Sequence, residues 1–265
     1  MYHAPYLALK YLRYYLASSN GRGHGTHSPF IFDFITKVLN DNSPYKEYKQ
    51  AEGLRKRLLS DSRMFIVEDF GAGSGVLKEH ERSIKSIARN AAKSKKYGQL
   101  LFRIVKYYQP ATILELGTSL GITTTYLSLA NPASKIVTME GAKEIAAIAK
   151  LNFRQLAISN IELVEGNFDN TLPDVLKGTN TVDFAFIDGN HRQIPTENYF
   201  QMLLPHLHND SILVFDDIHW SKGMEQAWET IKNSPDVRCT IDLFFIGIVV
   251  FRKEFREKQH FTIRF

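Results

Sequence analysis

The stretch Ala-Thr-Ile-Leu-Glu-Leu-Gly-Thr-Ser-Leu-Gly, residues 111 to 121, carries the strongest structural signal in the chain. Ile113 to Leu116 is a short, mostly apolar run of the kind found in strands buried on both faces of a parallel sheet. Gly117 ends this run, and a mostly apolar run from Ile122 to Ala130 predicts a helix. A strand, a glycine turn and a helix N-terminus in this order present backbone N–H groups to the polar end of a ligand.

A second predicted strand, Lys135 to Glu140, ends in an acid. Glu140 stands about 20 residues beyond the glycines, where nucleotide-binding folds present a carboxylate to ribose hydroxyls. Thr118 or Ser119 is the predicted N-cap of the intervening helix. The glycines, the helix and the acid together indicate a site for a nucleoside-type cofactor, with a purely structural turn as the alternative.

These residues carry a family resemblance. Leu114 to Thr123, followed by Thr138-Met-Glu140, resembles the first two motifs of class I S-adenosylmethionine-dependent methyltransferases, and the catechol and caffeoyl-CoA O-methyltransferase branch most closely. The likeness spans roughly Tyr97 to Phe251. It implies S-adenosylmethionine as the cofactor, with five residues around its methionine moiety and the second motif at its ribose. The implied contacts are Glu115, Gly117, Ser119, Gly121 and Thr123 for the methionine, and Glu140 for the ribose. Gly141 is a further predicted cofactor-binding residue.

A second glycine-rich stretch, Val67 to Gly75, has a residue order similar to that of a cofactor-binding loop. The residues after Gly75 are strongly charged, and no strand ending in an acid follows at the right distance. We therefore reject 71–75 as the cofactor loop. The loop at 117–121 also lacks the G-x-G-x-x-G spacing of dinucleotide sites, which argues against an NAD enzyme.

The composition limits the classes of protein to which the chain can belong. The 265 residues are 44% hydrophobic and 23% charged, which is ordinary for a globular protein. Cys239 is the only cysteine, so no internal disulfide can form. The longest apolar run, Leu243 to Phe251, is far shorter than the ~20 residues of a membrane span. With no charged and apolar leader, a cytoplasmic protein without a membrane partner is expected.

The N-terminal part differs in charge and pattern from the rest. Through Pro110 the formal net charge is +10, and after it −5. We predict a helical region at 1–95, providing a lid, substrate contacts or oligomer contacts, and a cofactor-binding methyltransferase domain at 96–265. The first helix, Met1 to Ala17, has a tyrosine-rich face for packing or for a homodimer contact. The loop 20–29, with His24 and His27, is either a linker or a lid.

Strands and helices alternate with short connections from residue 112 onward. Strands are predicted at 112–116, 135–139, 160–165, 182–187, 211–215, 237–243 and 247–251, and helices at 120–130, 143–157, 195–206 and 223–233. This alternation predicts an α/β fold with a doubly wound, mostly parallel sheet. The last two strands have a short connection and predict an antiparallel pair. The resemblance implies a seven-stranded, Rossmann-like methyltransferase sheet with this hairpin at its C-terminal end.

Ligands of open parallel sheets bind at the carboxyl ends of the strands, so the residues just past each strand are candidates for the site. Asn167 or Phe168 follows the third strand, where adenine is expected. Asp188 follows the fourth strand and is predicted to contact the cofactor as well. Asp216 and Asp217 follow the fifth strand.

Several carboxylates in one cleft repel one another unless a cation compensates. Asp188, Asp216 and Asp217 therefore predict a site for Mg²⁺ or another divalent cation. The alternative is that Asp216 serves only the cofactor and Asp217 caps the next helix. The resembled branch has Asn where Asp217 stands, and a lysine base where His191 stands. His191 can take a proton from a substrate hydroxyl, so Asp188, His191 and Asp216 are the predicted catalytic residues.

Three functions remain open from the sequence, with an aminopropyltransferase on the same fold as a remote fourth. The first is O-methylation of a small-molecule hydroxyl, with or without metal assistance. The second is an RNA or protein methyltransferase that uses the basic N-terminal region, which is less favoured because Asp188 to His191 lacks an Asn/Asp-Pro-Pro-Tyr-type motif. The third is a protein that binds the cofactor without transferring the methyl group.

Overall fold

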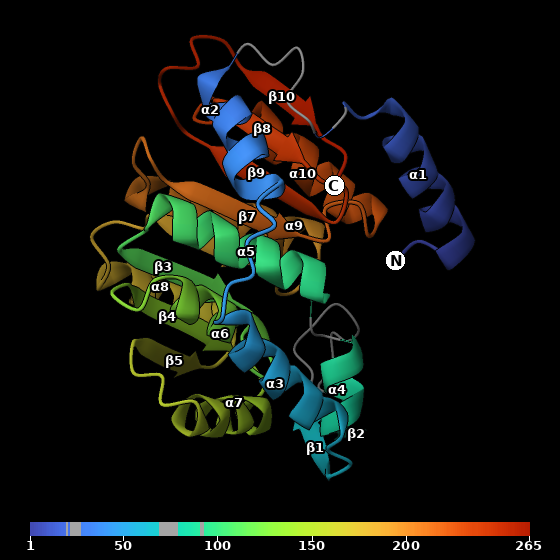
Figure 1. Ribbon diagram of the computed structural model, residues 1–265, viewed down its shortest axis with the longest axis vertical. Coiled ribbons are helices and arrows are strands. Elements are labelled where there is room, and N and C mark those ends of the chain that lie inside the picture. Colours follow the sequence, from blue (N-terminus) through green and yellow to red (C-terminus); the bar gives the residue numbers. More distant parts are fainter. Residues whose placement is uncertain (20, 22–27, 69–78, 91–92) are drawn as a thin grey trace. The chain divides into compact units, whose positions relative to one another are not determined.

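A computed structural model describes residues 1–19, 21, 28–68, 79–90 and 93–265. The chain forms two compact units, whose helices and strands are labelled in Figure 1. The first unit comprises Met1–Asn40 with Leu172–Phe265, and the second comprises Asp41–Thr171. These units do not follow the predicted division at residue 95, which stays a prediction. His24 and His27 of the loop 20–29, and the glycine loop at 71–75, lie outside the described residues.

The second unit contains three parallel strands in the order β3-β4-β5, which lie side by side in Figure 1. They are β3 (Thr112–Leu116), β4 (Lys135–Glu140) and β5 (Ile161–Glu165). In β3 the side chains from Ile113 to Leu116 are all buried, as their apolar run predicts. The register sets Glu115 level with Thr138 and sets Glu140 level with Glu165.

Helices and one hairpin complete the second unit. The hairpin pairs β1 (Met64–Glu68) and β2 (Glu79–Ser83) in antiparallel fashion, and it was not predicted. The helices are α3 (Tyr48–Leu59), α4 (Ile84–Asn90), α5 (Lys95–Tyr108), α6 (Ile122–Ala130) and α7 (Lys143–Gln155). An unpredicted helix, α8 (Phe168–Lys177), follows β5 and runs past the end of this unit.

The first unit contains five strands in the order β10-β8-β9-β7-β6. They are β6 (Phe184–Ile187), β7 (Ile212–Asp216), β8 (Cys239–Asp242), β9 (Ile246–Val250) and β10 (Gln259–Thr262). β6 and β7 are parallel, whereas β9 is antiparallel to both β7 and β8. The predicted α/β class, the mostly parallel strands and the C-terminal antiparallel hairpin are thus confirmed. All seven predicted strands are present, and β10 adds one that was not expected.

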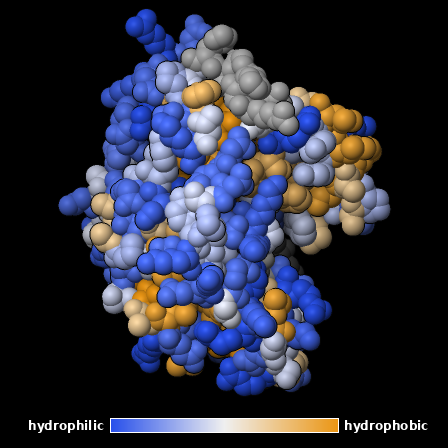
Figure 2. All heavy atoms as spheres, viewed as in Figure 1, coloured by the Kyte–Doolittle hydropathy of each residue, from blue (hydrophilic) through white to orange (hydrophobic). Residues whose placement is uncertain are grey.

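The helices of the first unit include the amphipathic N-terminal one. They are α1 (Ala4–Ala17), α2 (Pro29–Asp33), the π-helix η1 (Phe34–Leu39), α9 (Gln193–Leu203), the 3-10 helix η2 (Leu204–His206) and α10 (Lys222–Asn233). Tyr11 of α1 packs on the rings of Phe244 and Phe245, and the hydroxyl of Tyr14 donates to the carbonyl of Ile263. This part of the tyrosine face packs within its own unit. Figure 2 shows that hydrophobic residues also gather on the outer surface of α1.

Cys239 lies on β8 with none of its surface exposed, and burial raises the pKa of its thiol to about 12.

Among the helices that the structure describes, none has the length and apolar character that a membrane crossing requires.

Gly121 should be intolerant of a side chain for two separate reasons. Its φ of 81° lies in the left-handed region, and an added Cβ would stand 2.5 Å from the ring of Phe153. We expect Gly121→Ala to lower the free energy of unfolding by about 2 kcal/mol or more, from backbone strain and overpacking together. Urea denaturation measures the loss. Gly53→Ala is the matched control, because nothing lies within 4 Å of a Cβ there.

Gly53 lies inside α3, where alanine is the better helix former. Gly53→Ala should therefore raise the free energy of unfolding by about 0.5–1 kcal/mol. Equal effects of the two substitutions would contradict the assignment of strain and crowding to Gly121.

Candidate functional site

The loop between β3 and α6 has an unusual backbone. Gly117, Ser119 and Gly121 all have positive φ, at 105°, 49° and 81°. The N–H groups of Gly117 and Thr118 both donate to the carbonyl of Met139 at 3.0 Å, which fastens the start of the loop to β4. Gly121, with no side-chain cap, is the N-cap of α6, so the prediction that Thr118 or Ser119 caps this helix is wrong. The chain needs a left-handed residue at that point, and Gly adopts this conformation without strain.

Glu140 closes this loop from the end of β4. One carboxylate oxygen, Oε2, accepts the N–H of Ser119 at 2.8 Å, and the other, Oε1, accepts the N–H of Ala142 at 3.0 Å. Each oxygen of an ionised carboxylate can accept more than one hydrogen bond. The backbone therefore fixes the orientation of the carboxylate while leaving it able to accept two ligand hydroxyls.

Glu115 is a fully buried acid beneath the same loop. Its Oε2 accepts hydrogen bonds from the hydroxyls of Thr124 at 2.5 Å and Thr138 at 2.6 Å. Its Oε1 is buried and has no hydrogen-bond partner among the residues that the structure describes. Burial raises the pKa of Glu115 to about 7, the two threonine hydroxyls act in the opposite direction, and the charge of Glu140 adds to the rise. A buried oxygen of this kind suits a ligand that brings a donor or a positive charge.

The raised pKa of Glu115 should make stability depend on pH. The folded state holds this proton up to about pH 7, whereas the unfolded chain releases it near its ordinary value of 4.5. The folded state thus binds more protons between these values, and stability falls as the pH rises through the window. The fall for this group is on the order of 3 kcal/mol.

Urea unfolding of the wild type and Glu115→Gln at several pH values between 4.5 and 7.5 tests this expectation. Glu115→Gln cannot titrate, so its free energy of unfolding should fall less steeply with pH. Parallel curves for the two proteins would show that the Glu115 carboxyl does not titrate in this range.

Four further predicted cofactor residues also belong to the second unit. Thr123 is buried in the first turn of α6, and Gly141 directly follows Glu140. The side-chain oxygen of Asn167 accepts the N–H of Asp169 at 3.0 Å, and Phe168 is the first residue of α8. Asn167 therefore shapes the start of α8, and its contact with adenine stays a prediction.

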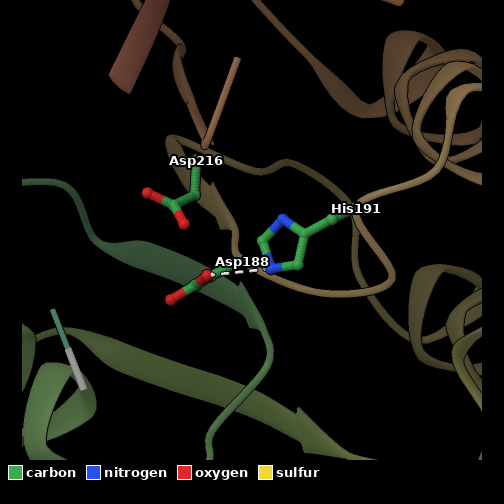
Figure 3. A group of neighbouring side chains, drawn as sticks. All are labelled: Asp188, His191 and Asp216. Carbon is green, nitrogen blue, oxygen red and sulfur yellow. Dashed lines mark ion pairs between the residues drawn. The ribbon is translucent and has the colours of Figure 1, made fainter. Parts of the chain in front are cut away.

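The second group of candidates lies in the first unit, at the ends of β6 and β7. Because these strands are parallel, with Ile187 level with Phe215, their carboxyl ends reach the same edge. Figure 3 shows the result: the imidazole of His191 points toward the carboxylates of Asp188 and Asp216. Nε2 of His191 lies 3.5 Å from Oδ1 of Asp188. Ligand atoms of all three residues lie within 4.8 Å of one another, and Asp216 is 1% exposed.

The backbone of the loop after β6 is strained around His191. Asn190 and His191 have φ values of 68° and 45°, and non-glycine residues seldom occupy this region. The amide of Asn190 donates to the hydroxyl of the buried Tyr199 at 3.0 Å, and Nε of Arg192 donates to the Asn190 oxygen. Such strain persists only where surrounding contacts hold it, and it concentrates at functional sites.

The donor set of Asp188, His191 and Asp216 suits a divalent cation. Carboxylate oxygens are the ligands that Mg²⁺, Mn²⁺ and Ca²⁺ prefer, and an imidazole nitrogen widens the choice to softer metals. Asp217 does not belong to this group of three, so its role as a metal ligand stays a prediction. The alternative that Asp217 caps the next helix is wrong, because Ser221 Oγ accepts the N–H of Met224 and caps α10.

His219, the other histidine of this region, has structural partners. Its Nδ1 lies 3.0 Å from Glu225 and its Nε2 lies 2.8 Å from Asp242. Burial acts to lower its pKa, but the two carboxylates outweigh burial and raise the pKa above its ordinary value. His219 therefore links α10 to β8.

Comparisons with known proteins agree with this arrangement. Residues 114–218 match a family model described as a methyltransferase domain. A catechol O-methyltransferase from Niastella koreensis is 28% identical over 124 residues, which are 46% of this chain and 55% of that relative. This chain thus spans about half the length of that curated relative.

Solved structures share the fold. The O-methyltransferase TomG from Streptomyces achromogenes aligns with a TM-score of 0.54 and 22% identity, over 62% of this chain and 82% of TomG. The methyltransferase PaMTH1 from Podospora anserina aligns with a TM-score of 0.59 and 15% identity, over 85% of this chain and 97% of PaMTH1. Residues 114–218 are therefore similar to a methyltransferase domain, and the chain shares the fold of these solved methyltransferases.

Proposed function

We propose that this protein transfers the methyl group of S-adenosylmethionine to a hydroxyl oxygen of a small-molecule acceptor. The observation that carries the proposal is the group of two carboxylates and one imidazole at the ends of β6 and β7. Such a group can bind and deprotonate a hydroxyl. The catechol O-methyltransferase relative is named for an acceptor with neighbouring hydroxyls.

The second unit supplies the proposed cofactor site. Glu140, held by the N–H groups of Ser119 and Ala142, accepts the two ribose hydroxyls. Glu115, which the positive charge of the methionine end would keep ionised, offers its remaining buried oxygen to that charge. Support comes from TomG, whose structure was determined in complex with SAM, and from the SAH-bound PaMTH1.

The first unit supplies the proposed acceptor site. Asp188 and Asp216 would hold a divalent cation, since their ligand atoms lie close enough together to share one ion. Such an ion, when bound, lowers the pKa of an acceptor hydroxyl. His191 takes the hydroxyl proton on its imidazole, and the nearby Asp188 carboxylate stabilises the imidazolium that forms.

The transfer itself is a direct displacement. The acceptor oxygen forms a bond to the methyl carbon while the carbon–sulfur bond breaks, and S-adenosylhomocysteine leaves with the electron pair. Because the sulfonium already activates the methyl group, the protein contributes alignment and deprotonation.

Two measurements test the proposal. Calorimetry should show S-adenosylmethionine binding, and methyl-labelled S-adenosylmethionine should deliver label to a catechol-type acceptor when Mg²⁺ or Mn²⁺ is present. Binding without transfer to any hydroxyl acceptor would favour a cofactor-binding protein without transferase activity. Label found only in RNA or protein would favour the macromolecular alternative.

A further inference from the structure

The outer face of α1 exposes a run of large apolar side chains. Leu9, Leu12 and Leu16 are 44%, 52% and 71% exposed, and Tyr6 and Tyr15 are exposed beside them. Figure 2 shows hydrophobic residues gathered where Figure 1 draws α1. Contiguous apolar patches on a protein surface mark sites of association.

The spacing along this face is that of a helix–helix seam. Pro5, Leu9, Leu12 and Leu16 are separated by four, three and four residues, which is the alternation of a heptad repeat. We call these four residues the leucine seam. Its pattern is the same in both directions, because Pro5 and Leu16, and likewise Leu9 and Leu12, are equally far from the point between Lys10 and Tyr11.

Contacts on the opposite face of α1, and at Tyr2 just before it, hold the helix against the rest of the first unit. The hydroxyl of Tyr2 donates to Oε2 of Glu225 at 2.7 Å, and Lys10 forms an ion pair with the same carboxylate. Tyr11 packs edge-on against Phe244. The helix cannot turn to bury its leucine seam within the unit without breaking these contacts.

We propose that the leucine seam binds the leucine seam of a second copy of this chain, with the two α1 helices antiparallel about a twofold axis. A seam that is symmetric about its midpoint is complementary to itself in this arrangement, which is what a twofold interface requires. Leu9 of each copy lies level with Leu12 of the other, and Pro5 lies level with Leu16.

The flanks of the seam are compatible with self-association. In an antiparallel pair of helices, the residues that flank the seam on one side lie next to the same flanking residues of the partner helix. Arg13 of one copy therefore lies beside Tyr6 of the other. An arginine over a tyrosine ring is an attractive pair. On the other side Tyr15 lies beside Ala8, whose small side chain allows close approach. No two like charges meet across the seam.

The charge of α1 favours a protein partner over a lipid surface. Helices that bind anionic membranes carry several Lys or Arg residues on the polar face. Lys10 is engaged with Glu225, so Arg13 is the basic residue that α1 leaves at the surface. A single helix buries less surface than the ~800 Å² per partner of a standard interface. We therefore expect a dissociation constant in the micromolar range.

Sedimentation velocity of the full chain from about 1 to 100 μM tests the interface, because this range brackets a micromolar equilibrium. The wild type should pass from monomer to dimer, and Leu12→Glu should remain monomeric throughout. Leu151→Glu is the matched control, since Leu151 is 53% exposed on α7, which belongs to the second unit and is not part of the leucine seam. It should dimerise like the wild type.

A mixing experiment tests the antiparallel arrangement. A Leu9→Lys chain mixed with a Leu12→Glu chain should form a heterodimer, because the new lysine and glutamate lie level across the seam. Circular dichroism should show both variants folded. If Leu12→Glu does not fold, Leu16→Glu replaces it in the sedimentation experiment, and Leu9→Glu mixed with Leu12→Lys replaces the pair used for mixing.

Three results would overturn the proposal. They are a wild type that stays monomeric, a dimer that survives Leu12→Glu and Leu16→Glu, and a monomer whose seam instead mediates binding to vesicles of phosphatidylserine and phosphatidylcholine. None of these readouts involves methyl transfer, so they are independent of the proposed activity.

Discussion

Asp216→Ala should reduce methyl transfer to a catechol-type acceptor by a factor of about 1,000 or more, because it removes a carboxylate that holds the proposed cation. Asp216 ends β7, is almost fully buried and lies with Asp188 and His191. Alanine offers no oxygen to an ion, and the remaining carboxylate alone should not retain it. Single-turnover rates with saturating S-adenosylmethionine measure the effect.

Asp217→Asn is the matched control for Asp216→Ala. Asparagine is one of the few residues that tolerates the left-handed backbone at this position, where φ is 53°. It also keeps a carbonyl oxygen, so most of the activity should remain. A chelator should inhibit the wild type, and added Mg²⁺ or Mn²⁺ should restore it. Transfer that is unaffected by the chelator and by Asp216→Ala would contradict the metal site and leave deprotonation to His191 alone.

Glu140→Ala should weaken S-adenosylmethionine binding by roughly 2–3 kcal/mol, a factor of about 30 to 150, the scale of a charge-assisted hydrogen-bonded pair. The N–H groups of Ser119 and Ala142 orient this carboxylate in advance. Its loss removes both the ribose contact and the tie that closes the loop. Isothermal titration calorimetry measures the dissociation constant.

Glu165→Ala is the control for Glu140→Ala. Glu165 ends the neighbouring strand level with Glu140, but it is exposed and forms an ion pair with Lys150 at 2.6 Å. Exposed ion pairs contribute at most about 1 kcal/mol to stability. Glu165→Ala should leave the dissociation constant unchanged, and an equal loss for both variants would point to a general effect of charge at this edge.

The strands that the sequence predicts well are those whose burial leaves a clear pattern. The predicted strand at 112–116 coincides with β3, because its side chains after Thr112 are all buried. β10 was missed because it contributes mostly exposed side chains, and Gln259 and His260 give no apolar alternation. Pro173 and the polar residues at the start of α8 obscured that helix.

The candidate site likewise has residues whose grouping could be predicted from the sequence and contacts that could not. Asp188, His191 and Asp216 could be grouped from sequence, because parallel strands bring their ends to one edge and each residue follows or ends a strand. The hydrogen bonds of Glu115 to Thr124 and Thr138 could not be predicted in this way. They depend on the register that sets Glu115 level with Thr138, and only pairing of the strands fixes a register. A run of threonines at the start of a buried helix was the available signal.

The buried thiol of Cys239 makes the protein convenient for labelling. A thiol with a pKa of about 12 and no exposed surface has almost no thiolate at neutral pH, and maleimide reagents react with the thiolate. A cysteine introduced at an exposed position would therefore be the reactive thiol of the native protein, with no need to replace Cys239. Fluorescent dyes could be attached at one chosen residue, so that distances and their fluctuations can be followed in single molecules.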